Sequence, residues 1–394
     1  MTREEFPIAR TAFVSTYPPQ QCGIATFTQD LSSNIGDREI VALHAVQHPL
    51  PNSLEVHHRI RRDERDDYVR TARGLGGCVK AVSIQHEFGI WGGPDGRYVL
   101  DFVEALDVPA VTTLHTVLAA PTPEQRAVLA ELIGRSQRVV VMSRSAAALL
   151  ATAYGIDGGK LDIIPHGVPD LPLIDPASVK PGLGVDGREV ILSFGLLGPG
   201  KGLELAIDAL PAVVAEHPAV CYVIVGATHP DLVRVEGEAY RSRLVAQIHA
   251  LGMDDHVRFV DRFVGRVELT RWLEAADVFV TPYPKLDQIV SGTLSYAMAA
   301  GRAIVSTPYT YATELLAEGR GVLVPPGSAE GFASAVNDIL GDHELRAALG
   351  RRAYAHSRGM VWSAVGREYR RVFDRVTTDA SVTERSGSFA AVGA

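Results

Sequence analysis

Short apolar runs alternate with longer amphipathic stretches along the first half of the chain. The runs consist mostly of Val, Ile and Leu without polar alternation, which is typical of parallel strands covered on both faces. Strands that alternate with helices form βαβ units, so this pattern predicts an α/β domain with a parallel sheet. The predicted strands are residues 11–16, 39–46, 79–85, 110–115, 138–143 and 161–165, and the predicted helices are 24–35, 122–134 and 144–153.

The same pattern restarts after a stretch rich in proline and glycine. Residues 168–187 read VPDLPLIDPASVKPGLGVDG and have no helical or strand period, which is typical of an interdomain linker. The strands predicted after it are residues 189–195, 219–226, 256–260, 277–283, 303–308 and 321–325. One helix is predicted to begin near residue 201, and three more are predicted at 238–251, 329–340 and 343–357.

The two halves predict two Rossmann-like, doubly wound domains, residues 1–172 and 188–358, joined by a linker at 173–187. Open parallel sheets bind ligands at the carboxyl ends of their strands, so we expect the two domains to face each other across a ligand cleft. An amphipathic helix is predicted at 361–376. The tail 377–394 lacks periodic apolar residues and is expected to be disordered.

Composition narrows the class of protein. Of 394 residues, 46% are hydrophobic and 21% charged, which is typical of a globular chain, and the net charge of −8 argues against a general nucleic-acid binder. The three cysteines, Cys22, Cys78 and Cys221, have neither zinc-site spacing nor a disulfide pattern, which fits a reducing compartment. Without a signal-peptide pattern or a long apolar span, we expect a cytoplasmic protein.

Each domain has a glycine-containing loop between its first strand and the next helix. In the first domain this is Gly23, for which an ordinary turn is an equally good interpretation. The second domain has GLLGPGKG, in which Gly195, Gly198 and Gly200 precede Lys201. Backbone amides at such a turn hold a diphosphate and the ammonium neutralises it, so we favour phosphate binding over a solvated turn lysine.

Three histidines follow strands in the first domain: His86, His115 and His166. A lone histidine is more often structural, but three at strand ends favour ligand contact. His86 and His166, with Glu87 and Trp91, are predicted to form an acceptor pocket. Trp91 can stack on a sugar face or belong to the core.

The segment PYPKLDQIVSGTLSYAM, residues 282–298, follows a strand of the second domain. Its SGT is predicted to start a helix at Gly292 or Thr293, capped by Ser291 or Thr293, whose N-terminus can meet an anion or a sugar hydroxyl. Asp287 and Gln288 lie just before this turn and are candidate donor contacts, with a solvated loop as the alternative.

Several motifs, taken together, resemble those of a known family. STYPP with GIATF, TLHT, VVMS, IPHGV, GLLGPGKG, YAMAAGRAIVSTP and GVLVPPGS occur in this order within residues 11–376. In order and spacing the chain resembles the retaining GT-B glycosyltransferases of family GT4, the group 1 glycosyltransferases. The resemblance implies that residues 361–376 cross back onto the first domain.

The resemblance also implies roles for single residues. Lys201 would hold the diphosphate of the donor, Gly23 would contact it from the other domain, His115 would lie beside the donor sugar, and Glu314 on the nucleotide side. Configuration would be retained by front-face attack, and charge on the leaving diphosphate would be stabilised by Lys201 and helix N-termini, without a metal or other cofactor. The string DERDD, residues 63–67, is interpreted as a solvated charge run.

Two positions depart from the family pattern. Leu196 stands where relatives have arginine, with Arg262 and Arg266 as candidate replacements. The Glu-x7-Glu pair is replaced by Gln288 and Tyr296. Gln288 can still bond sugar hydroxyls, Asp287 is one residue away, and Tyr296 offers one hydroxyl. We therefore place the chain in an atypical subgroup of the family.

The expected function is transfer of a sugar from a nucleotide-diphosphate sugar, of the GDP-mannose or UDP-hexose type, to a saccharide or small-molecule acceptor. His115, Lys201 and Gln288 are the candidate catalytic residues. A catalytically silent nucleotide-sugar binding module and a nucleotide-sugar 2-epimerase are the alternatives, and the absence of a signal peptide disfavours a periplasmic sugar-binding protein.

Overall fold

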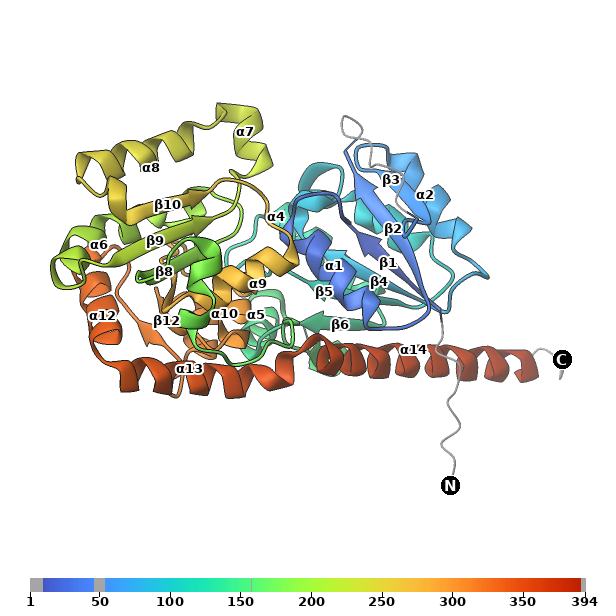
Figure 1. The fold of residues 1–394 in the computed structure, drawn as a ribbon. Helices are drawn as coiled ribbons and strands as arrows, with labels where there is room; N and C mark the ends of the chain where they lie inside the picture. Colours follow the sequence, from blue (N-terminus) through green and yellow to red (C-terminus); the bar gives the residue numbers. More distant parts are fainter. Residues whose placement is uncertain (1–9, 46–53, 157, 391–394) are drawn as a thin grey trace, which may run out of the picture. The chain divides into compact units, whose positions relative to one another are not determined.

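The computed structural model describes residues 10–45, 54–156 and 158–390, with side chains described as far as Asp379. The chain divides into two compact units (Figure 1). Unit 1 is Met1–Gly167 with Trp362–Ala394, and unit 2 is Val168–Val361. Val46, which was predicted to end a strand, and residues 391–394 of the predicted tail lie outside the described residues.

The described part of unit 1 holds a seven-stranded parallel sheet in the order β3-β2-β1-β4-β5-β6-β7. Its order reverses between β1 and β4, as in doubly wound folds. The strands are β1 (Thr11–Ser15), β2 (Arg38–His44), β3 (His58–Arg61), β4 (Ala81–His86), β5 (Ala110–Leu114), β6 (Arg138–Val141) and β7 (Leu161–Ile163). All residues of β1, β4 and β5 are buried, as expected of strands covered on both faces.

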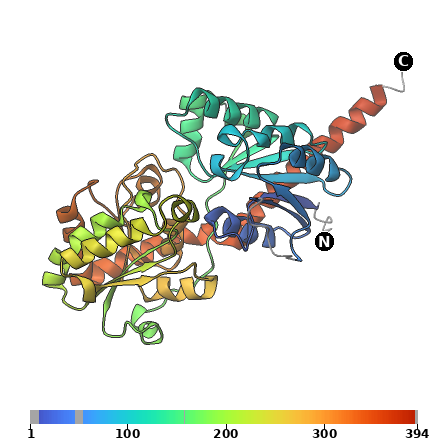
Figure 2. The ribbon, with the colours of Figure 1, turned by 90° about the horizontal axis from the view of Figure 1, so that it is seen from above.

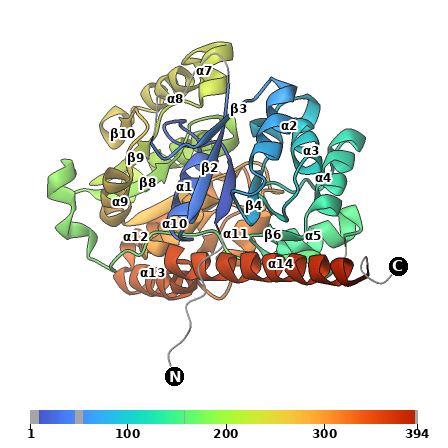
Figure 3. The same ribbon diagram turned by 90° about the vertical axis from the view of Figure 1, so that its right-hand side faces the viewer.

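Helices cover both faces of this sheet. Ala12 and Val14 of β1 belong to a core built with three neighbouring helices, whereas Phe13 between them packs against Phe373 of the C-terminal helix. Figure 3 shows those three helices, α2, α3 and α4, side by side. The helices of unit 1 are α1 (Gly23–Ser33), α2 (Arg65–Gly74), α3 (Tyr98–Glu104), α4 (Pro123–Arg135), α5 (Arg144–Tyr154) and α14 (Trp362–Ala390).

The interpretation of residues 63–67 as a solvated charge run holds for the first four of these residues, which are exposed, and is wrong for Asp67. These residues lead into α2 and form its first turn, and Asp67 is buried. Its carboxylate accepts from Arg61 Nε at 2.7 Å and from the second guanidinium nitrogen at 2.8 Å. The sequence analysis predicted neither β3 nor α2. It missed β3 because this is an edge strand in which only Ile60 is buried.

Helix α14 packs on unit 1. Val365, Tyr369 and Phe373 are buried, and Tyr369 Oη lies 3.0 Å from Thr113 Oγ1 of β5. The expected disorder of residues 377–394 is wrong as far as Ala390, because α14 continues to that residue (Figure 2). Each residue added to an established helix gains a backbone hydrogen bond, so the extension needs no apolar period.

Unit 2 has a six-stranded parallel sheet in the order β10-β9-β8-β11-β12-β13. The strands are β8 (Glu189–Phe194), β9 (Val220–Val225), β10 (Val257–Val260), β11 (Val278–Thr281), β12 (Ala303–Ser306) and β13 (Val322–Leu323). The helices are α6 (Leu203–Glu216), α7 (Pro230–Glu236), α8 (Ala239–Ala250), α9 (Arg266–Ala275), α10 (Gly292–Ala299), α11 (Thr310–Leu315), α12 (Ala329–Gly341) and α13 (His343–Ser357). The chain therefore has two Rossmann-like α/β domains.

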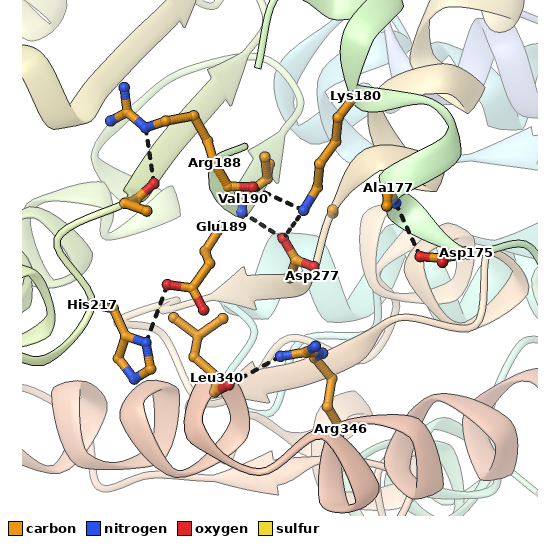
Figure 4. A network of polar contacts seen from close by, with 12 residues as sticks. Asp175, Ala177, Lys180, Arg188, Glu189, Val190, His217, Asp277, Leu340 and Arg346 are labelled. Atoms are coloured by element: carbon orange, nitrogen blue, oxygen red, sulfur yellow. Dashed lines mark hydrogen bonds and ion pairs between the residues drawn. The ribbon is translucent and has the colours of Figure 1, made fainter. Parts of the chain in front are cut away.

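The segment interpreted as a linker, residues 173–187, is an integral part of unit 2. Lys180 is 8% exposed, and its ammonium donates to Asp277 Oδ2 at 2.6 Å and to the Arg188 carbonyl at 2.9 Å (Figure 4). The same Asp277 oxygen accepts the amide of Val190 at 2.7 Å. A buried ion pair of this kind fixes the segment against β8 and the start of β11, so it is not a free linker.

Among the described residues, no helix combines the length and the apolar character that crossing a membrane requires.

Candidate functional site

The glycine-rich loop of unit 2 joins β8 to α6 and packs against the segment that follows β11. Gly202 has φ +59°, and a Cβ there would lie 2.1 Å from the Pro282 carbonyl oxygen. Gly195 has φ +126°, also a conformation that favours glycine. These two glycines let the loop turn back on itself, which places Lys201 beside Pro282 and the residues after it.

Lys201 contacts a tyrosine that the sequence did not single out. Its ammonium donates to Tyr283 Oη at 3.1 Å and lies 4.7 Å from the centre of that ring. Tyr283 Oη is 2.8 Å from Thr293 Oγ1, which is 3.1 Å from Ser291 Oγ. A Cβ on Gly195 would lie 3.6 Å from Lys201 Nζ. The structure thus brings Gly195, Lys201, Ser291 and Thr293 together.

Helix α10 begins at this cluster, and the prediction of its start is confirmed. Gly292 is its first residue, and Ser291 caps it by accepting the amide of Leu294. The first amides of a helix have no intrahelical partner and carry partial positive charge. Together with the Lys201 ammonium they favour an anion. A small pocket here is lined by Ser193, Phe194, Gly195, Leu197, Lys201, Leu203, Val280, Thr281 and Tyr283.

Tyr283 is 3% exposed and stacks on Tyr309 with ring centres 5.0 Å apart. Burial works to raise the pKa of Tyr283, but the charge of Lys201 and hydrogen bonding with Thr293, Lys201 and Ser291 outweigh it, so the pKa lies below its ordinary value. The sequence feature that could have pointed to Tyr283 is its position just after β11, at the same sheet edge as Lys201.

The other predicted donor contacts of unit 2 are more scattered. The Gln288 amide donates to the Val290 carbonyl at 2.7 Å, and Asp287 is exposed. Tyr296 lies on α10 with its ring 6.3 Å from Phe194, and Glu314 lies on helix α11 rather than in a turn. Among the described residues, no hydrogen bond or ion pair joins Gln288 or Asp287 to Lys201.

The remaining loop positions differ in their surroundings. Gly198 is extended, and a Cβ there would lie 3.0 Å from Leu232, whereas a Cβ on Gly200 would meet open space. Arg262, a candidate to replace the missing arginine, is held by Glu268 at 2.6 and 2.7 Å. Arg266, the other candidate, is the first residue of α9.

In unit 1, Gly23 is the first residue of α1, and Cys22 caps that helix by accepting the amide of Ala25. A Cβ on Gly23 would meet no atom within 4 Å. The helix N-terminus is therefore open at this glycine.

His115 follows β5 and is held by a defined hydrogen-bond chain. Gln85 Nε2 donates to Ser83 Oγ at 3.0 Å, which turns Gln85 Oε1 towards His115 Nε2 at 2.9 Å. An amide oxygen only accepts, so the proton of the neutral imidazole is on Nε2 and Nδ1 is an acceptor. Burial, with smaller effects of His166 and His86, lowers the pKa of His115 to about 3. His115 is therefore neutral at pH 7.

The other two histidines are also neutral. His166 Nδ1 donates to the Gly167 carbonyl at 2.7 Å, and its ring lies 5.1 Å from Phe27, which also packs 4.8 Å from His115. Burial lowers the pKa of His166, and that of His86, to about 4. His86 is fully buried against Phe88, and among the described residues neither ring nitrogen has a hydrogen-bond partner. The ring reaches no surface, so its contact with an acceptor stays a prediction that the burial does not support.

Of the two interpretations of Trp91, the structure supports the core one. The indole is 3% exposed in the unit 1 core and donates to the Gln85 carbonyl at 3.0 Å. Glu87 caps a short 3₁₀ turn by accepting the Gly89 amide at 2.7 Å, and burial raises its pKa. Of the predicted acceptor residues, Glu87 is partly exposed and His166 is 8% exposed.

Sequence comparisons agree with these two units. The model of the group 1 glycosyl transferases matches residues 178–356, and that of glycosyltransferase family 4 matches residues 81–170, so the two cover more than half of the chain. A phosphatidyl-myo-inositol mannosyltransferase of Mycolicibacterium smegmatis is 29% identical over 289 residues, 73% of this chain and 70% of that protein. A D-inositol 3-phosphate glycosyltransferase of Kineococcus radiotolerans is 27% identical over 300 residues, 69% and 67% of the two chains.

Solved structures share the fold. The Anabaena protein HepE in complex with UDP and glucose superposes with a TM-score of 0.75 at 17% identity, covering 93% of this chain and all of that one. Sucrose-phosphate synthase of Thermosynechococcus elongatus also has a TM-score of 0.75 at 17% identity, over 94% of this chain and all of that one. With both family matches and the two parallel sheets, the chain belongs to the group 1, or GT4, glycosyltransferases of the GT-B fold.

Proposed function

We propose that this glycosyltransferase moves a hexosyl group from a nucleotide-diphosphate sugar, of the GDP-mannose or UDP-hexose class, to a hydroxyl of a saccharide or small molecule. The observation that carries the proposal is the Lys201 ammonium at the N-terminus of α10, beside Gly195 and Thr293. One relative is named a mannosyltransferase, and one structural neighbour holds UDP and glucose, which supports these donor classes.

The proposed reaction retains the configuration at the anomeric carbon. The bond from that carbon to the diphosphate oxygen breaks and its electron pair leaves with the diphosphate. The acceptor hydroxyl bonds to the same face of the sugar, and its proton passes to the leaving diphosphate oxygen. Lys201 and the first amides of α10 stabilise the charge that builds up on the diphosphate in the transition state.

Within unit 1, the resemblance assigns Gly23 and His115 to the donor, whereas the position of Glu87 and His166 after strands suggests contact with the acceptor. A neutral His115 with an accepting Nδ1 suits a hydrogen bond from a sugar hydroxyl rather than proton donation. Because Lys201 and helix N-termini supply the positive charge, we expect transfer to need no metal. Turnover that persists in excess EDTA is the expected result.

A thermal-shift panel of UDP, GDP, ADP and TDP tests this function. A ligand that binds only the folded protein stabilises it by about 2.7 kcal/mol at one hundred times its Kd. We expect one base to stand out with the wild-type protein and its shift to be largely lost in Lys201→Ala. No shift with any nucleotide, or an equal shift in Lys201→Ala, would contradict the proposal.

A catalytically silent nucleotide-sugar binding module is the second candidate. The Gln288 amide bonds to its own loop, and the two carboxylates of the family pair are absent, which favours it. Such a module binds the nucleotide but neither transfers nor hydrolyses the donor. A donor-turnover screen with the nucleotide sugar of the preferred base separates the two functions.

A further inference from the structure

We propose that Tyr283 is a positioning residue that holds the Lys201 ammonium in place for the donor diphosphate. This inference rests on the proposed function and extends it to a residue outside the glycine-rich loop. Tyr283 does so through its hydroxyl, which is carried on a ring that is itself fixed by packing.

The hydroxyl fixes where the ammonium lies. An ammonium only donates, so Lys201 Nζ donates to Tyr283 Oη at 3.1 Å. The phenol hydrogen is then free to go to Thr293 Oγ1, 2.8 Å away at the start of α10. A line of hydroxyls therefore connects the lysine to Thr293 and Ser291. This line sets the ammonium beside the helix N-terminus, where an anion is favoured.

The ring that carries this hydroxyl is itself held in place, and it adds a weaker attraction to the same ammonium. Lys201 Nζ lies 4.7 Å from the Tyr283 ring centre, within the range of a cation–π contact. The ring cannot tilt away, because it is 3% exposed and stacks on Tyr309 at an interplanar angle of 20°. A lysine side chain otherwise has many rotamers, and loss of that freedom on binding weakens affinity.

Tyr283 also connects the glycine-rich loop after β8 to the start of α10. It follows Pro282, whose carbonyl oxygen excludes any Cβ at Gly202 of the loop. The lysine loop after β8 and the start of α10 thus meet at one buried tyrosine. Without the hydroxyl of Tyr283, Lys201 would keep its charge but lose its fixed position.

The test compares how variants bind a nucleoside diphosphate and the matching nucleoside, by calorimetry, with the base that the thermal-shift panel selects. Tyr283→Phe keeps the stacked ring and loses the hydroxyl. We expect it to weaken nucleoside diphosphate binding about tenfold, the loss of one hydrogen bond to a charged group, and to leave nucleoside binding unchanged. General structural damage would weaken both ligands alike.

A double-mutant cycle identifies the partner. If Tyr283 acts through Lys201, Tyr283→Phe should have no further effect in a Lys201→Ala background. Tyr311→Phe is the matched control, because it removes a fully buried hydroxyl that bonds Ser295 and not the lysine. It should leave diphosphate binding at the wild-type value.

The outcomes are distinct. Failure of the wild-type protein to bind any nucleoside diphosphate overturns the proposed function. Wild-type binding that Lys201→Ala weakens and Tyr283→Phe does not overturns the inference about Tyr283 alone. Equal effects of Tyr283→Phe with and without Lys201 also overturn it, since the hydroxyl would then act independently of the lysine.

Discussion

Lys180 Nζ lies 2.6 Å from Asp277 Oδ2. Lys180 belongs to the segment 173–187, before the first strand of unit 2, and Asp277 directly precedes β11, so the ion pair fixes this segment to the sheet. The two residues are 97 positions apart, and both are more than 90% buried. The pair explains why a sequence stretch with the composition of a linker packs as part of the domain.

Removing either partner leaves an uncompensated buried charge. We expect Lys180→Met or Asp277→Leu to lower the free energy of unfolding by about 3–5 kcal/mol, measured by urea denaturation. Lys285→Met, at an exposed lysine of the same unit, is the control and should cost little. Equal midpoints for Lys180→Met and the control would show that the pair does not hold the segment.

The lysine loop offers a matched pair of glycines. Gly202→Ala forces a left-handed residue and a Cβ only 2.1 Å from a carbonyl oxygen, so we expect a loss of at least about 2 kcal/mol in unfolding free energy. Gly200→Ala meets open space two residues away and should lie within about 0.5 kcal/mol of the wild-type protein. A Gly202→Ala protein as stable as Gly200→Ala would mean that the loop does not need this turn.

The buried histidines predict sensitivity to acid. The pKa of His86 is about 4 in the folded protein, below its unfolded value of roughly 6.5, so the unfolded chain binds a proton first. Stability is therefore lost as the pH falls from about 6.5 to 4, at about 1.4 kcal/mol per pH unit for each fully buried histidine.

His86→Leu removes one such group and should lose less stability than the wild-type protein between pH 6.5 and 4.5. Thermal unfolding at both pH values measures the difference. His249→Leu, at an exposed histidine, should follow the wild-type curve. Parallel curves for His86→Leu and the wild-type protein would contradict the burial argument.

Gln85 sets the tautomer of His115 through the hydrogen bond at Nε2. Gln85→Glu places a carboxylate where the amide oxygen accepts from Nε2, and an opposite charge at hydrogen-bond distance favours the imidazolium. The pKa of His115 should rise from about 3 towards its ordinary value, as followed by NMR titration of the ring nitrogens. An unchanged His115 titration would mean that the glutamine does not govern the ring.

Most of the fold was predictable because buried parallel strands are unbroken runs of Val and Ile. Edge strand β3 escaped because His58, Arg59 and Arg61 surround its single buried residue. The full length of α14 was not predicted, because continuation of a helix depends on backbone hydrogen bonds rather than on an apolar period.

The candidate site was predictable only in part. Lys201 and Ser291 carry local signals, a glycine-rich turn and a helix cap. Tyr283 has no such signal, since its role depends on two loops that meet after β8 and β11. For Trp91 the sequence left two interpretations open, because a tryptophan in a glycine-rich stretch has the same pattern whether it faces a ligand or the core.

The most direct test of the account is donor turnover with and without the lysine. Wild-type protein and Lys201→Ala are incubated with a panel of nucleotide sugars, and release of the nucleoside diphosphate is measured with and without saccharide acceptors. We predict acceptor-dependent release from one donor class by the wild-type protein, and at least a hundredfold lower rate in a folded Lys201→Ala, consistent with the loss of a major electrostatic contact to the transition state. Equal release by both proteins, or none from any donor by the wild-type protein, would contradict it.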